Sequence, residues 1–133
     1  MTKKTAIDVQ VGGGHYKSLA TQPVEVSMIA GLSYCEGNLV KYLTRDKGNR
    51  LEDIRKAYHY IMLQQQLVNE GKFTIPFCSS FQEGVDVYMD EFFNQFQQGR
   101  VYSSILYCMM THNYSKAREM LTKFVRYGRW EEI

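Results

Sequence analysis

Residues 37–45 have the sequence GNLVKYLTR, and residues 52–60 have the sequence EDIRKAYHY. An α-helix turns by about 100° per residue, so positions i, i+3 and i+7 share one face. Polar residues recur at this spacing in both segments: Asn38, Lys41 and Arg45 in the first, and Asp53, Lys56 and Tyr60 in the second. Two neighbouring helices with such stripes would enclose a polar, mainly cationic site.

The chain around these segments predicts an all-α fold, a compact bundle of five to six helices with an N-terminal glycine-rich loop. It has only 2 prolines and lacks the alternating β-branched runs that strands favour. Ser33 and Glu36 form an S-x-x-E capping box before the first polar segment. The short turn at 46–50 makes the two polar segments antiparallel neighbours. The expected helices cover residues 23–30, 34–45, 51–69, 80–96, 101–110 and, after a cap at Asn113 or Ser115, the chain to Tyr127.

Glycines and apolar residues give these helices their expected ends and buried faces. Gly31, Gly71 and Gly99 are expected to end the helices that precede them, because glycine favours the backbone conformation found there. The expected apolar side of the helix at 34–45 consists of Tyr34, Leu39, Val40 and Leu43.

The whole chain, residues 1–133, fits one domain. Within it, residues 12–70 hold the polar segments, and residues 73–133 form a helical scaffold or oligomerisation extension. This second half is rich in aromatic residues, which predicts a homo-oligomer. The net charge of +2 is too small to indicate binding to nucleic acid.

No part of the sequence indicates a membrane or an export route. No apolar run approaches the roughly 20 residues of a membrane span, and the N-terminus lacks the apolar core of a signal peptide. Cys35, Cys78 and Cys108 are odd in number and form no CxxC pair, which is typical of thiols in a reducing compartment. We therefore expect a cytoplasmic protein.

The polar residues of the first segment suit a phosphorylated ligand. Lys41 supplies a point charge, Arg45 a bidentate fork and Asn38 a directional hydrogen bond. Between residues 41 and 56 the chain has 6 basic residues against 3 acidic ones, a local excess that the net charge hides. The alternative is a solvated helix face held by ion pairs between residues one turn apart.

Asp53 and His15 are the candidate acid–base groups. Asp53 would orient Lys56, bind a metal through phosphate or act as a base, and its simpler role is to complement the helix dipole. His15 follows the glycines at 12–14, which would form either a phosphate-facing loop or a linker. Further candidate ligand contacts are Tyr16, Lys17, Tyr42, Lys47, Lys56 and Tyr60.

Several common catalytic motifs are missing from the sequence. The chain has no GxxxxGK[ST] phosphate loop, no GxSxG elbow, no HExxH pair and no cluster of cysteine and histidine. It also lacks the ExxE…ExxD acidic set of helical nucleotide pyrophosphohydrolases. No metal bound directly by the protein is therefore expected.

Four short motifs occur together within about residues 12–66. They are His15-Tyr16, Gln22-Pro23-x-Glu25, Gly37-Asn38-x-x-Lys41-Tyr42-x-x-Arg45 and Glu52-Asp53-x-x-Lys56-Ala57-x-x-Tyr60. This combination resembles a small family of phage nucleotide kinases that was long classed as a domain of unknown function. The resemblance implies a phage protein in the cytoplasm of a bacterial host, handling nucleotides without a P-loop as an oligomer. Residues 73–133 have no counterpart in that family.

The resemblance and the cations leave two functions open, and with them the question whether the chain is an enzyme. The first is a (deoxy)nucleoside monophosphate kinase with His15, Lys41, Arg45 and Asp53 as catalytic residues. It would use ATP or a dNTP as phosphoryl donor, with Mg²⁺ as a further candidate cofactor. The alternative is a non-catalytic sponge for a nucleotide-derived signalling molecule of host antiviral defence. A sponge needs the same cations and aromatic rings but no turnover.

Overall fold

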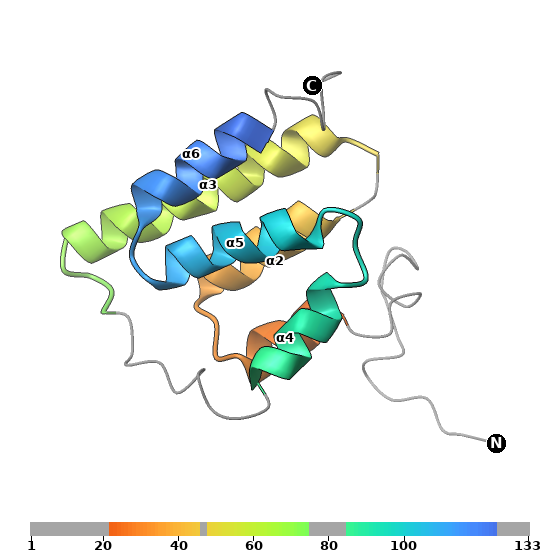
Figure 1. Cartoon of the computed structure of the whole chain (residues 1–133). Coiled ribbons are helices and arrows are strands. Elements are labelled where there is room, and N and C mark those ends of the chain that lie inside the picture. Colours follow the sequence, from red (N-terminus) through yellow and green to blue (C-terminus); the bar gives the residue numbers. More distant parts are fainter. Residues whose placement is uncertain (1–21, 46–47, 75–84, 125–133) are drawn as a thin grey trace.

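The computed structural model describes residues 22–45, 48–74 and 85–124 (Figure 1). Within these ranges the chain forms six helices and no strand, which confirms the all-α prediction. The helices are α1 (Pro23–Ile29), α2 (Tyr34–Thr44), α3 (Arg50–Asn69), α4 (Val85–Phe93), α5 (Gly99–Met110) and α6 (Tyr114–Phe124).

Local sequence signals place the first two helices. Pro23 is the first residue of α1, where its missing N–H leaves no hydrogen bond unmade. Gly31, with a φ of 66°, lies directly after the C-terminal end of α1 and its cap residue, as predicted. The predicted capping box at the start of α2 is present, because Ser33 Oγ accepts from Glu36 N at 3.0 Å and Glu36 Oε1 accepts from Ser33 N at 2.9 Å.

Four helices surround the main core. α2 packs antiparallel to α3, and α5 and α6 cover this pair while packing against each other (Figure 1). The remaining two helices, α1 and α4, contact each other, with α1 also against α2 and α4 also against α5. The centre of the core is formed by the fully buried side chains of Leu39, Leu43, Ile61, Ile105, Leu106 and Met109.

A buried polar network crosses this core. Gln64 of α3 donates from Nε2 to Glu36 Oε2 at 2.9 Å and contacts the hydroxyl of Tyr114 in α6 at 3.2 Å. Ser33 Oγ completes the network by donating to Gln64 Oε1. Glu36 and Gln64 are almost fully buried, and burial raises the pKa of Tyr114. The network therefore fixes α2, α3 and α6 in one relative register.

Two predictions about the second half of the chain were wrong. Gly99 does not close the fourth helix but is the first residue of α5, and α4 ends at Phe93 instead of residue 96. Glycine is needed at residue 99 because the start of α5 packs against the end of α4, where a Cβ would collide with the carbonyl group of Phe93. α6 is described to Phe124, and the predicted end at Tyr127 lies outside the described residues.

The apolar face of α2 differs from the prediction at its first residue. Leu39, Val40 and Leu43 are buried as expected, but Tyr34 is 76% exposed and Cys35 is buried beside it. Tyr34 is the first residue of the helix, and its ring lies against that of Tyr60 in α3. Cys35 is a free thiol whose pKa is raised by burial, which suits a structural role.

Candidate functional site

Three tyrosines form a row on the outer side of the α2–α3 pair. The rings of Tyr42 and Tyr60 are nearly parallel, with centroids 6.0 Å apart and 9° between their planes. Tyr34 meets Tyr60 edge to face, with centroids 6.1 Å apart and 70° between the planes. Burial, followed by a side-chain hydrogen bond with Tyr34, raises the pKa of Tyr60. The three rings thus form one continuous aromatic cluster across the two helices.

Three cations from the two helices gather around the ring of Tyr42. Lys41 Nζ and Lys56 Nζ each lie 5.2 Å from its centroid, and Arg45 Cζ lies 5.9 Å away. The two ammonium groups are therefore separated by at most twice 5.2 Å, although they come from different helices. We call Tyr34, Lys41, Tyr42, Arg45, Lys56 and Tyr60 together the cationic tyrosine surface.

The predicted meeting of the two polar stripes is thus present in the structure. Lys41 of α2 and Arg45, the residue directly after α2, meet Asp53, Lys56 and Tyr60 of α3 beside the ring of Tyr42. Asn38, the third residue of the first stripe, instead bonds the carbonyl oxygen of Tyr34 within α2. The alternative of a solvated face with ion pairs also holds in part, because Lys56 Nζ lies 3.4 Å from Glu52 Oε1 at the exposed start of α3. Exposed pairs of this kind are weak and leave the ammonium group accessible to an anion.

Arg45 and Asp53 connect the surface to the protein interior. Their side chains form an ion pair at 3.9 Å, with the Asp53 side chain only 7% exposed. Arg45 Nε is buried and has no hydrogen-bond partner among the described residues. In this geometry Asp53 holds Arg45 next to Tyr42, whereas a role for Asp53 as a base or metal ligand stays a prediction.

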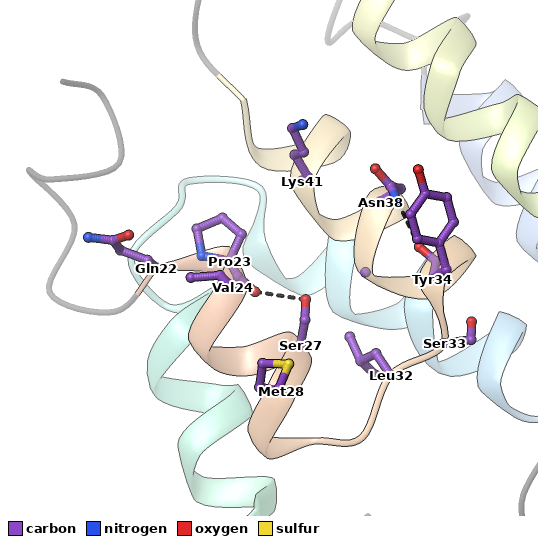
Figure 2. Close-up of a pocket in the computed structure, with 11 residues that line it drawn as sticks. Gln22, Pro23, Val24, Ser27, Met28, Leu32, Ser33, Tyr34, Asn38 and Lys41 are labelled. Atoms are coloured by element: carbon purple, nitrogen blue, oxygen red, sulfur yellow. Dashed lines mark hydrogen bonds between the residues drawn. The ribbon is translucent and has the colours of Figure 1, made fainter. Parts of the chain in front are cut away.

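An open pocket of about 420 Å³ lies between α1 and α2 (Figure 2). Asn38 and Lys41 line it from α2, together with Tyr34. Asn38 donates from Nδ2 to the carbonyl oxygen of Tyr34 at 2.8 Å, which accounts for an asparagine within a helix. The pocket and the cationic tyrosine surface share Tyr34 and Lys41.

Several predicted site residues lie outside the described part of the chain. They are His15, Tyr16, Lys17 and Lys47, along with the glycines at 12–14. Among the described residues, no group of three or more histidine, cysteine, aspartate or glutamate side chains is arranged to hold a metal ion. None of the described helices combines the length and the apolar character needed to cross a membrane.

One cation near the site has a structural role that the sequence did not reveal. Arg50, at the start of α3, donates to the backbone carbonyl oxygen of Leu43 at 2.8 Å and also to that of Arg45. It thereby satisfies carbonyl groups at the C-terminal end of α2, which is otherwise one of the open ends of a helix. The sequence showed a cation after a tight turn but not the direction of its side chain.

The chain matches no protein-family model, no curated protein and no solved structure. The resemblance to phage nucleotide kinases therefore stays a prediction, carried by the motifs in residues 12–66.

Proposed function

We propose that this protein binds a nucleotide on the cationic tyrosine surface and acts there as a (deoxy)nucleoside monophosphate kinase without a P-loop. The observation that carries the proposal is the convergence of Lys41 and Lys56, from two helices, on the ring of Tyr42. Two ammonium groups that lie close together at a partly exposed surface match the anionic phosphates of a nucleotide, and the aromatic and apolar side chains nearby can receive its flat base.

Phosphoryl transfer would make modest demands on this surface. A phosphate oxygen of the acceptor forms a bond to the γ-phosphorus of ATP or a dNTP, and the bond from that phosphorus to the bridging oxygen breaks. The products are the two nucleoside diphosphates. The acceptor oxygen is already ionised, so no general base is needed, and Lys41 and Lys56 would stabilise the charge on the transferring group. Mg²⁺ would accompany the donor phosphates.

Sequestration of a nucleotide-derived signal is the second candidate, favoured by the position of Asp53. Its carboxylate is only 7% exposed and paired with Arg45, so it presents no open acidic group for catalysis at the cationic tyrosine surface. Lys41 and Lys56 would bind an anionic ligand whether or not a reaction follows. Both candidates use the same binding residues and differ only in turnover.

Binding is tested by replacing the lysines, because both side chains are partly exposed and their removal leaves the core intact. We expect Lys41→Ala and Lys56→Ala each to weaken nucleotide binding by about tenfold in calorimetric titration. Arg55→Ala is the matched control, since Arg55 is an exposed cation next to Lys56 on α3. Arg45 is a poorer target, because its loss leaves the buried carboxylate of Asp53 unpaired. Unchanged affinity in both lysine variants would refute the proposed site.

Turnover separates the two candidate functions. The protein is incubated with ATP, Mg²⁺ and each of the four dNMPs, and the formation of ADP and dNDP is followed by chromatography. A kinase produces both in equal amounts, and Lys41→Ala slows their formation. Tight binding of a nucleotide with no diphosphate formed, across several divalent metals, would reject the kinase in favour of sequestration.

A further inference from the structure

The pocket between α1 and α2 has apolar walls and a polar rim. Its walls include Val24, Met28 and Leu32, and its rim includes Asn38 and Lys41 (Figure 2). A volume of about 420 Å³ lies within the range of pockets that bind small organic molecules. Two of the wall residues are well exposed, Val24 at 54% and Met28 at 77%, so a bound ligand would cover apolar surface that now faces solvent.

At one point of the pocket lining, α1 approaches α2 closely at a glycine. A Cβ on Gly37 would lie 3.2 Å from Ser27 Oγ, so the missing side chain permits the close contact of the two helices. Ser27 is held in place by donating from Oγ to the carbonyl oxygen of Pro23 at 2.7 Å, a bond drawn in Figure 2. The contact between Ser27 and Gly37 therefore sets the positions of the two helices that line the pocket.

The rim carries hydrogen-bonding groups suited to a base edge. Asn38 uses Nδ2 to bond the carbonyl oxygen of Tyr34, and it makes no other hydrogen bond among the described residues. Its Oδ1 and second amide hydrogen are therefore available as an acceptor and a donor, the pair that an amide offers to a nucleobase. The exposed ring of Tyr34 adds an aromatic edge to the same rim.

The pocket and the cationic tyrosine surface are placed to bind two parts of one ligand. Tyr34 and Lys41 belong to both, and they lie two turns apart on the same face of α2, about 10 Å along the helix. Lys41 stands at the boundary, because it lines the pocket and also lies 5.2 Å from the centroid of the Tyr42 ring. A ligand with an apolar flat end in the pocket would have its charged end beside Lys41 and Lys56.

We infer that the α1–α2 pocket holds the base of the nucleotide whose phosphates lie on Lys41 and Lys56. This inference rests on the proposed function and adds the position of the base. Val24 and Met28 cover the base, Asn38 bonds its edge, and Lys41 bridges the base and the phosphates.

The test compares a nucleotide with the matching inorganic anion. Titrations use the tightest-binding member of a panel of ATP and the four dNMPs, against tripolyphosphate for ATP or phosphate for a dNMP. The pocket variant carries Val24→Ser and Met28→Ser together. The control is Ile29→Ser, because Ile29 is 50% exposed on the same helix but does not line the pocket. We expect the pocket variant to lose about fivefold or more in nucleotide affinity and none in affinity for the inorganic anion.

Each other outcome overturns a distinct statement. Unchanged nucleotide affinity in the pocket variant, together with weaker binding of both ligands by Lys56→Ala, places the base elsewhere and leaves the proposed function standing. Equal losses for both ligands in the pocket variant also reject a base subsite. Failure of the wild-type protein to bind any nucleotide of the panel rejects the proposed function itself.

Discussion

Glu36 is a buried carboxylate that is balanced by hydrogen bonds instead of a cation. Among the described residues it forms no ion pair, and its two oxygens accept from Ser33 N and from Gln64 Nε2, each at 2.9 Å. A buried carboxylate lowers the stability of the fold unless its oxygens accept hydrogen bonds. Gln64 supplies one of these bonds, so it contributes more to the free energy of unfolding than an exposed glutamine does. Gln64 also donates to the hydroxyl of Tyr114, so the position of α6 depends on the same residue.

We predict that Gln64→Leu lowers the free energy of unfolding by about 2–3 kcal/mol, because it leaves Glu36 Oε2 without this donor in the core. Gln66→Leu is the matched control on the same helix, since Gln66 is exposed and, within the described part of the chain, its side chain bonds only Glu70. The control should change stability by less than about 0.5 kcal/mol. Urea denaturation measures both variants, and similar small losses in the two would contradict the role of the network.

At the scale of the elements, the first residue of α3 is bonded to the C-terminal end of α2. Arg50 reaches back from the first residue of α3 to the carbonyl groups that end α2. It thus orients the same two helices that carry the cationic tyrosine surface. The positions of Lys41 and Lys56 relative to each other depend on this connection.

Arg50→Lys is expected to destabilise the fold by about 1–2 kcal/mol, because a single ammonium group does not reproduce the two-pronged contact of the guanidinium. Arg55→Lys, an exposed change on the same helix, should be neutral. Thermal and urea unfolding of the two variants provide the measurement. Equal stability of Arg50→Lys and the wild type would show that the helix end needs no such cap.

At the scale of the whole molecule, one hydrogen bond joins the first described helix to the second half of the chain. Tyr88 of α4 donates its hydroxyl to Glu25 Oε2 of α1 at 2.8 Å. Burial, followed by this bond, raises the pKa of Tyr88 to about 12. The pocket wall on α1 is thereby braced by α4, a helix more than 50 residues later in the chain.

This bond predicts a dependence of stability on pH. The folded protein holds the Tyr88 proton more tightly than the unfolded chain, whose tyrosine pKa is about 10. The stabilisation is complete below about pH 10 and is lost as the pH rises toward about 12. Tyr88→Phe removes the contribution of this hydroxyl to stability. The free energy of unfolding of the variant should therefore fall less steeply than that of the wild type from about pH 9 to 11.5. Identical slopes in urea titrations would disprove the contribution.

The sequence by itself determined the helical class, the start of α2 and the residues of the two polar stripes. These features depend on local causes: a capping box at Ser33, glycines at 31 and 71 with positive φ, and the periodicity of the helix. The meeting of the stripes was also predictable, because a turn as short as that at 46–50 leaves antiparallel packing as the simplest arrangement.

Only the tertiary structure decided which stripe residues are exposed and which are buried. Asp53 is buried and paired with Arg45, whereas Tyr34 is exposed. Arg50 bonds the C-terminal end of α2, and a pocket lies between α1 and α2 beside Gly37. The sequence spacing fixes the direction of a side chain around its own helix. Its exposure depends on where the neighbouring helices cross, and here that is set by contacts between residues far apart in the chain, such as Glu36 with Gln64 and Glu25 with Tyr88.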